Sequence, residues 1–132
     1  MDRKKLTKRL IYLIFFILIL DFLANNFFWY SSIWYLDIFM HFLGGFWVGL
    51  LFFYLFSFEK HSLGVIFKAL FFVFLIGVGW EVYEAFVNNA VAQNPFNFFD
   101  TASDIFFDLL GGFCAILYIL VPFKNQRTGI KD

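Results

Sequence analysis

Long apolar runs separated by short polar segments make up almost the whole chain. Each of four runs approaches the roughly 20 apolar residues that a helix needs to cross a bilayer. Between the third and fourth runs, Asn94-Pro95 is a turn signal that stops a continuous helix. We therefore expect an all-α fold, in which residues 1–132 form one transmembrane domain built as a four-helix bundle. The predicted helices cover about Leu10–Ala24, Ile38–Phe58, Leu63–Val87 and Ile105–Phe123.

Two copies of one ten-residue motif lie at the starts of the second and fourth predicted helices. Asp37–Phe46 and Asp104–Phe113 are identical at seven of ten positions, and each carries two ionisable residues four apart, followed by a glycine pair. A second match, D/E-x-x-x-N-N, begins at Asp21 and at Glu84. We interpret these matches as two parallel helix-hairpin repeats, related by an axis along the membrane normal. The alternative is chance recurrence in a biased composition.

Composition and charge support a membrane location and predict an orientation. The chain is 62% hydrophobic and 26% aromatic, whereas soluble domains are roughly 45–50% apolar. Its ten Lys and Arg residues all lie before the first run, near the second turn or after the fourth run. The positive-inside rule therefore predicts cytoplasmic N- and C-termini. The basic start resembles a signal peptide, but no A-x-A-like cleavage site follows, so we expect an uncleaved first helix.

Acidic residues gather on the opposite side of this predicted topology. No Lys or Arg lies in the outer half, so His41 is the only candidate cation there. Capping and the helix dipole can account for acids at the starts of helices two and four, but not for acids near the ends of helices one and three. An ionised carboxylate at membrane depth is costly unless it is paired, neutralised or hydrated. The seven acids are Asp21, Asp37, Glu81, Glu84, Asp100, Asp104 and Asp108.

Helical spacing is expected to bring these polar side chains together. Residues three or four positions apart share one helix face, and the glycine pairs let another helix come close. Carboxylates with one imidazole suit Mg²⁺, Mn²⁺ or Ca²⁺, and the imidazole also permits Zn²⁺ or Fe²⁺. We therefore expect a divalent metal ion, of unspecified identity, near the outer leaflet. The candidate metal ligands are Asp37, His41, Asp104 and Asp108, and the candidate catalytic residues, acting as general bases, are Glu81 and Glu84.

These motifs resemble those of the VanZ-like membrane proteins and the related YjdF-type proteins. Both have an acid-x-x-x-His-Phe turn on one helix, a Glu on the next and a D-x-x-x-D/N-x-x-G turn on the last. The resemblance implies a multi-pass protein of the bacterial plasma membrane that acts in the cell envelope. VanZ itself is associated with resistance to teicoplanin, but the resemblance implies no particular reaction. The matching residues are Asp37, His41, Phe42, Glu81, Asp104, Asp108 and Gly111. Glu84 stands where VanZ-like proteins more often carry Gln, so Glu84, and Asp108 in place of Asn, look closer to the YjdF type.

Three functions remain open at this point. In the first, the acidic site binds a divalent cation and recognises or acts on an envelope lipid or lipid-linked precursor. Hydrolysis is disfavoured because the outer half has no Arg or Lys to hold a phosphate. In the second, the same carboxylates couple protons or cations to transport, which a homodimer would serve better than a single four-helix chain. In the third, the chain is a structural or partner-binding bundle. We expect no nucleic-acid partner.

Overall fold

The described chain is entirely helical. The computed structural model describes residues 3–56, 62–92 and 97–120, and no strand occurs among them. One short helix follows the first long helix, and a π-helical turn follows the third long helix. The elements are α1 (Arg3–Asn26), α2 (Trp29–Ser32), α3 (Leu36–Leu55), α4 (Leu63–Val87), η1 (Asn88–Ala92) and α5 (Phe98–Leu120).

Three helices are long and apolar enough to cross a membrane. They are Leu36–Leu55, Leu63–Ala90 and Phe98–Leu120. They confirm three of the long apolar helices that the sequence pattern predicts, as candidates for crossing the membrane. The first predicted span lies inside α1, and both its crossing of the membrane and the four-span bundle stay predictions.

The last helix begins earlier than the sequence predicts. The predicted start at about Ile105 is too late, because α5 already begins at Phe98. The side-chain oxygen of Asn97 accepts hydrogen bonds from the backbone N–H groups of residues 99 and 100, at 3.1 and 3.4 Å. Such a bond satisfies the otherwise unpaired donors of a first turn. The second predicted helix is also shifted, to Leu36–Leu55, and the predicted end at Phe123 lies outside the described residues.

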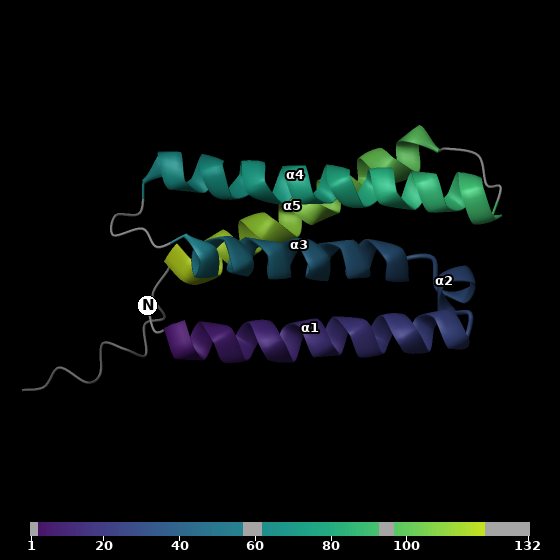
Figure 1. Cartoon of the computed structure of the whole chain (residues 1–132), viewed down its shortest axis with the longest axis horizontal. Coiled ribbons are helices and arrows are strands. Elements are labelled where there is room, and N and C mark those ends of the chain that lie inside the picture. The colour runs from purple at the N-terminus through teal and green to yellow at the C-terminus, as the bar shows by residue number, and fades with distance from the viewer. Residues whose placement is uncertain (1–2, 57–61, 93–96, 121–132) are drawn as a thin grey trace, which may run out of the picture.

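The helices alternate in direction, so α1 and α4 run one way while α3 and α5 run the other way (Figure 1). Helix α5 packs against both α3 and α4, and α1 packs against α2 and α3, while no Cα atom of α1 comes within 8 Å of one in α4. This arrangement is the one that two parallel hairpins would require, although duplication of the chain stays a prediction. The two helices that carry the repeated motif, α3 and α5, form the most extensive contact.

The distribution of polar and apolar side chains is inverted relative to a water-soluble protein. Large apolar side chains such as Phe22 and Phe71 are exposed, whereas His41, Glu81 and Asp104 are buried. Exposed aromatic rings would be costly over so much of a surface in water, but lipid tails solvate them without cost. The surface of the bundle therefore suits a bilayer.

Glycines set the distance between α3 and α5. A β-carbon on Gly45 would overlap the backbone carbonyl of Asp108, and one on Gly111 would overlap the carbonyl of Phe42. By contrast, a β-carbon on Gly44 would meet no atom within 4 Å. In each repeated motif one glycine of the pair makes the closest backbone approach, the second in α3 and the first in α5. This contact brings the acidic turns of both helices together.

Apolar packing closes the end of the bundle that carries the basic residues. Leu6 and Leu10 of α1 pack with Leu50 and Ala115. At the same end, an Arg3 guanidinium nitrogen donates to the Tyr54 carbonyl at 2.7 Å. The polar cluster lies toward the opposite end, near the connection that contains α2.

Replacing Gly45 by alanine should destabilise the protein, whereas replacing Gly44 should not. The Gly45 β-carbon has no space unless α3 and α5 separate, so we expect a loss of about 1–3 kcal/mol, the usual cost of overpacking. Gly44→Ala should leave stability unchanged or slightly higher, because alanine favours a helix. The free energy of unfolding of both variants can be measured by denaturant titration in a mild detergent. Equal stability of the two variants would show that the helices are not in backbone contact.

Candidate functional site

The site is organised around His41, which four carboxylates surround. Its Nε2 atom lies 3.4 Å from Asp104 Oδ2, 3.7 Å from Asp37 Oδ1 and 3.9 Å from Glu81 Oε1. The other ring nitrogen, Nδ1, lies 3.1 Å from Asp108 Oδ1, within hydrogen-bonding distance. The imidazole is thus the shared partner of acids from three helices.

Local sequence explains why these groups converge. Asp37 and His41 are four residues apart on α3, and Asp104 and Asp108 are four apart on α5, so each pair shares a helix face. The glycine contact between the two helices then places one pair opposite the other. Helix α4 leaves room for this arrangement at Gly77, where a β-carbon would lie 2.8 Å from Asp108 Oδ2.

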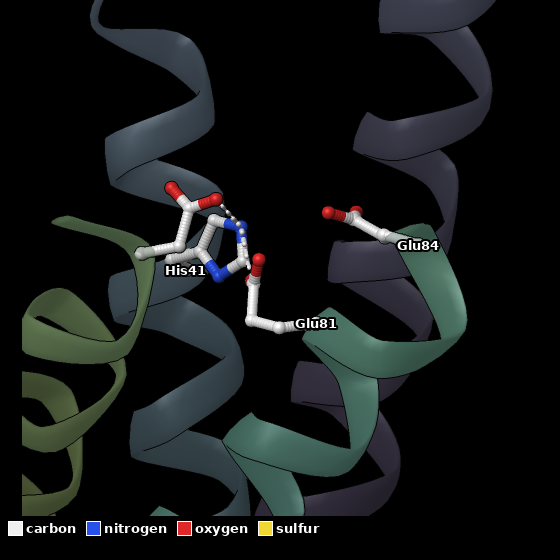
Figure 2. Close-up of side chains that lie close together, drawn as sticks. His41, Glu81 and Glu84 are labelled. Carbon is white, nitrogen blue, oxygen red and sulfur yellow. Dashed lines mark ion pairs between the residues drawn. The ribbon is translucent and has the colours of Figure 1, made fainter. Parts of the chain in front are cut away.

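Glu81 is the buried group whose bonding is incomplete. Only 7% of the residue is exposed, and its Oε1 atom has no hydrogen-bond partner among the described residues. Figure 2 shows the Glu81 side chain reaching from α4 toward His41. Because a buried polar atom without a partner costs free energy, such an atom calls for an explanation.

Glu84 lies one turn further along α4. Its Oε1 atom accepts the indole N–H of Trp80 at 3.0 Å, and in Figure 2 the side chain points to the same side as Glu81. Ligand atoms from His41 and three of the acids lie within 4.8 Å of one another, and a second such group shares Asp104. The two groups are His41, Glu81, Glu84 and Asp104, and Asp37, Asp100 and Asp104.

The structure divides the acids that the sequence treats as one set. Asp108 contacts the Nδ1 side of His41, apart from the acids near Nε2. Asp21 belongs to neither of the possible metal-binding groups. It instead accepts the Tyr30 hydroxyl at 2.5 Å, and burial together with this bond raises the pKa of Tyr30 well above its usual range. Sequence reasoning missed Tyr30, whose only signal is its place in an aromatic loop. The metal and catalytic roles of the individual residues stay predictions.

A cavity of about 920 Å³ adjoins the cluster. Residues of α1, α2, α3, α4 and α5 line it, and none of the described lining residues is a lysine or arginine. The lining includes His41 and Asp104 from the cluster, together with apolar side chains such as Val48 and Val73. The polar site is therefore continuous with an apolar space inside the bundle.

Fold and site together define a small helical membrane protein with a buried acid–imidazole cluster. A family model described as "Predicted membrane protein (DUF2238)" matches residues 1–125. The chain belongs to this family. Neither a curated protein nor a solved structure matches the chain. Membership in this family supports a membrane location. It assigns no reaction or ligand, and it does not bear on the resemblance to VanZ-like or YjdF-type proteins.

The contact between His41 and Asp108 should contribute more to stability than the contact between His41 and Asp37. Both members of the first pair are largely buried, whereas the Asp37 side chain is 44% exposed. In double-mutant cycles with His41→Gln, we expect a coupling energy of about 1–3 kcal/mol for Asp108→Asn, as for contacting residues in one network. For Asp37→Asn we expect less than about 0.5 kcal/mol, as for exposed helical pairs. Couplings of equal size would contradict the predicted difference.

Proposed function

We propose that the chain is a cell-envelope membrane protein whose acid–imidazole cluster binds a divalent cation and recognises an envelope lipid or lipid-linked precursor. The observation that carries the proposal is the buried Glu81 Oε1 atom, which has no hydrogen-bond partner among the described residues and faces His41 Nε2. A cation in this position would satisfy it. An acidic cluster alone would be weaker support, since its members could simply bond to one another.

The hydrogen bond to Asp108 suits His41 for metal binding. A carboxylate accepts and does not donate, so the imidazole donates from Nδ1 to Asp108 Oδ1. If His41 is neutral, this bond leaves the lone pair of Nε2 free on the side of Asp104 and Glu81. Ligand histidines are commonly oriented by a carboxylate in this way. Asp108, predicted from the sequence as a ligand, would then orient His41.

Glu81 and Glu84 would serve as ligands in this arrangement. Both belong to the group of atoms that could hold an ion together with His41 and Asp104. Three carboxylates and one imidazole suit Mn²⁺ and Mg²⁺, and they also accept Zn²⁺ or Fe²⁺. A bound cation would also offset the electrostatic cost of so many carboxylates at membrane depth.

Recognition of a lipid is better supported than its hydrolysis. Among the described residues that line the cavity beside the cluster, there is no lysine or arginine to hold a phosphate group. The general-base roles predicted for Glu81 and Glu84 would require one of them to leave the ligand group. The resemblance to VanZ-like and YjdF-type motifs, based on Asp37, His41 and Asp104, supports a role in the bacterial plasma membrane.

Wild-type protein should bind Mn²⁺ after chelator treatment, and Glu81→Gln should bind it much more weakly. The substitution keeps the shape of the side chain but removes a charged ligand. We expect a loss of affinity of about 10–100-fold or more, since even groups that only support a ligand have effects of that size. Free Mn²⁺ can be followed by electron paramagnetic resonance, with protein in phosphatidylcholine nanodiscs and with Mg²⁺, Ca²⁺ and Zn²⁺ as competitors.

Asp21→Asn is the matched control, because Asp21 is a nearby acid outside both possible ligand groups. This variant should bind Mn²⁺ like the wild type. A thermal melt of each variant distinguishes loss of a ligand from loss of the fold, and Glu84→Gln provides a second ligand variant. Failure of the wild type to bind any of the four ions would reject the proposed metal site.

The proposed orientation places α2 and η1 on the outer side of the membrane. In a Cys114→Ser background, a membrane-impermeant maleimide should label Asn89→Cys in intact cells, because Asn89 is exposed in η1. Ser62→Cys, exposed just before α4, should be labelled only after the cells are permeabilised. The reverse pattern would place the acidic cluster on the cytoplasmic side.

A further inference from the structure

The cavity lies where α1 stands away from the rest of the bundle. Helix α1 is buried only at Leu6, Leu10 and Ala24, near its two ends. It lines the cavity along its middle, as α4 does on another side, and no Cα atom of α1 lies within 8 Å of a Cα atom of α4. Leu18 of α1 and Ile76 of α4 both line the cavity and are 56% and 47% exposed. Helix packing therefore does not close the side between α1 and α4, which would face lipid tails.

The lining of the cavity is polar toward one end and apolar toward the other. Along α3, Asp37 precedes Val48 by 11 residues, and along α4, Val73 precedes Glu84 by 11 residues. At 1.5 Å per residue, each helix places its acid about 16 Å from its apolar lining residue. Since α3 and α4 run in opposite directions, both acids lie at the same end (Figure 1). This is the profile of a site for an amphiphile.

Charge indicates which head group would suit the polar end. Even a divalent cation and a protonated His41 would together neutralise only three of the seven outer acids, counted by formal charge. Four formal negative charges would remain, and the part of the chain that the structure describes contributes no lysine or arginine to the cavity lining. An anionic head group would be repelled, whereas a cationic one would be attracted.

Aromatic rings lie at the same end of the cavity. Tyr30 and Trp34 line it from the connection between α1 and α3, and Trp80 lines it from α4, one turn before Glu84. Aromatic faces near acids form the usual environment for an ammonium group, through cation–π attraction and direct ion pairing. Amines and quaternary ammonium groups share this chemistry.

We infer that the cavity binds an amphiphile with an ammonium head group and an apolar chain, which enters from the membrane between α1 and α4. The head group lies among the acids and aromatic rings, and the chain extends past Gly44 toward Val48 and Val73. A volume of about 920 Å³ is within the range of ligand-binding cavities. This inference names a lipid class for the proposed function. It depends on that function only because both use the same acidic cluster.

Gly44 allows the cavity to be filled without disturbing the fold. It lines the cavity, and an added β-carbon would meet no atom within 4 Å, so the side chain of Gly44→Leu can occupy the space proposed for the chain. Gly79→Leu is the matched control, because Gly79 also has nothing within 4 Å of an added β-carbon but is not among the residues that line the cavity.

The probes are two alkyl chains of equal length, each with a photoactivatable diazirine near its middle. One carries a trimethylammonium head and the other a phosphate head. Full-length protein in phosphatidylglycerol nanodiscs is irradiated with each probe, and the labelled peptides are identified by mass spectrometry. Each probe is compared between variants in the same nanodiscs, so that differences in partition into lipid cancel.

The ammonium probe should label peptides of α3 or α4 that line the cavity, and Gly44→Leu should reduce this labelling about tenfold, equivalent to 1.4 kcal/mol of lost affinity. Gly79→Leu should be labelled like the wild type. Asp21→Asn should reduce labelling by the ammonium probe while Mn²⁺ binding is retained. Labelling of the cavity by the phosphate probe that Gly44→Leu reduces by as large a factor would overturn the head-group assignment. Unchanged labelling of Gly44→Leu by the ammonium probe would overturn the location.

The outcomes for the metal and for the amphiphile are separable. If no divalent ion binds but labelling by the ammonium probe is blocked in Gly44→Leu, the metal site is rejected and the amphiphile site stands. If Mn²⁺ binds through Glu81 but Gly44→Leu has no effect on labelling, the metal site stands and the amphiphile site is rejected.

Discussion

Backbone contact between α3 and α5 is the constraint on which the rest of the structure depends. Two helices can come this close only where side chains are absent, and Gly45 and Gly111 supply those positions. Once the helices are in contact, the ionisable residues one turn earlier have no room to separate. His41 is then enclosed by acids from both helices and from α4. Small residues thus create a polar centre by determining how close the helices lie.

The same constraint accounts for the space beside the cluster. Because α3 and α5 use their glycines on each other and on α4, α1 is left with few positions for close packing. It is held near its start by Leu6 and Leu10 and near its end by Ala24. The middle of α1 is free to line a cavity instead of filling the core. The same packing arrangement therefore produces both the polar cluster and the apolar cavity, which have lining residues such as His41 and Asp104 in common.

Much of this could be predicted from the sequence, because it depends on local spacing. Apolar runs of sufficient length predicted three helices that are confirmed, and residues four apart predicted that Asp37 and His41 would share a face. Properties that depend on the geometry between helices could not be predicted. Periodicity along one helix does not reveal that Asp108 contacts the other nitrogen of His41, or that Glu81 Oε1 finds no hydrogen-bond partner in the described part of the chain. The start of α5 was missed because one asparagine side chain decides it.

The separation of charge along the bundle has an electrical consequence. The basic residues at the start of α1 lie at one end and the acidic cluster at the other, so a chain of zero formal net charge carries a large dipole along its length. A membrane potential acts on such a dipole, because moving one elementary charge through 100 mV changes the energy by about 2.3 kcal/mol. In an energised membrane that is negative inside, the voltage itself would favour insertion with the basic end inside.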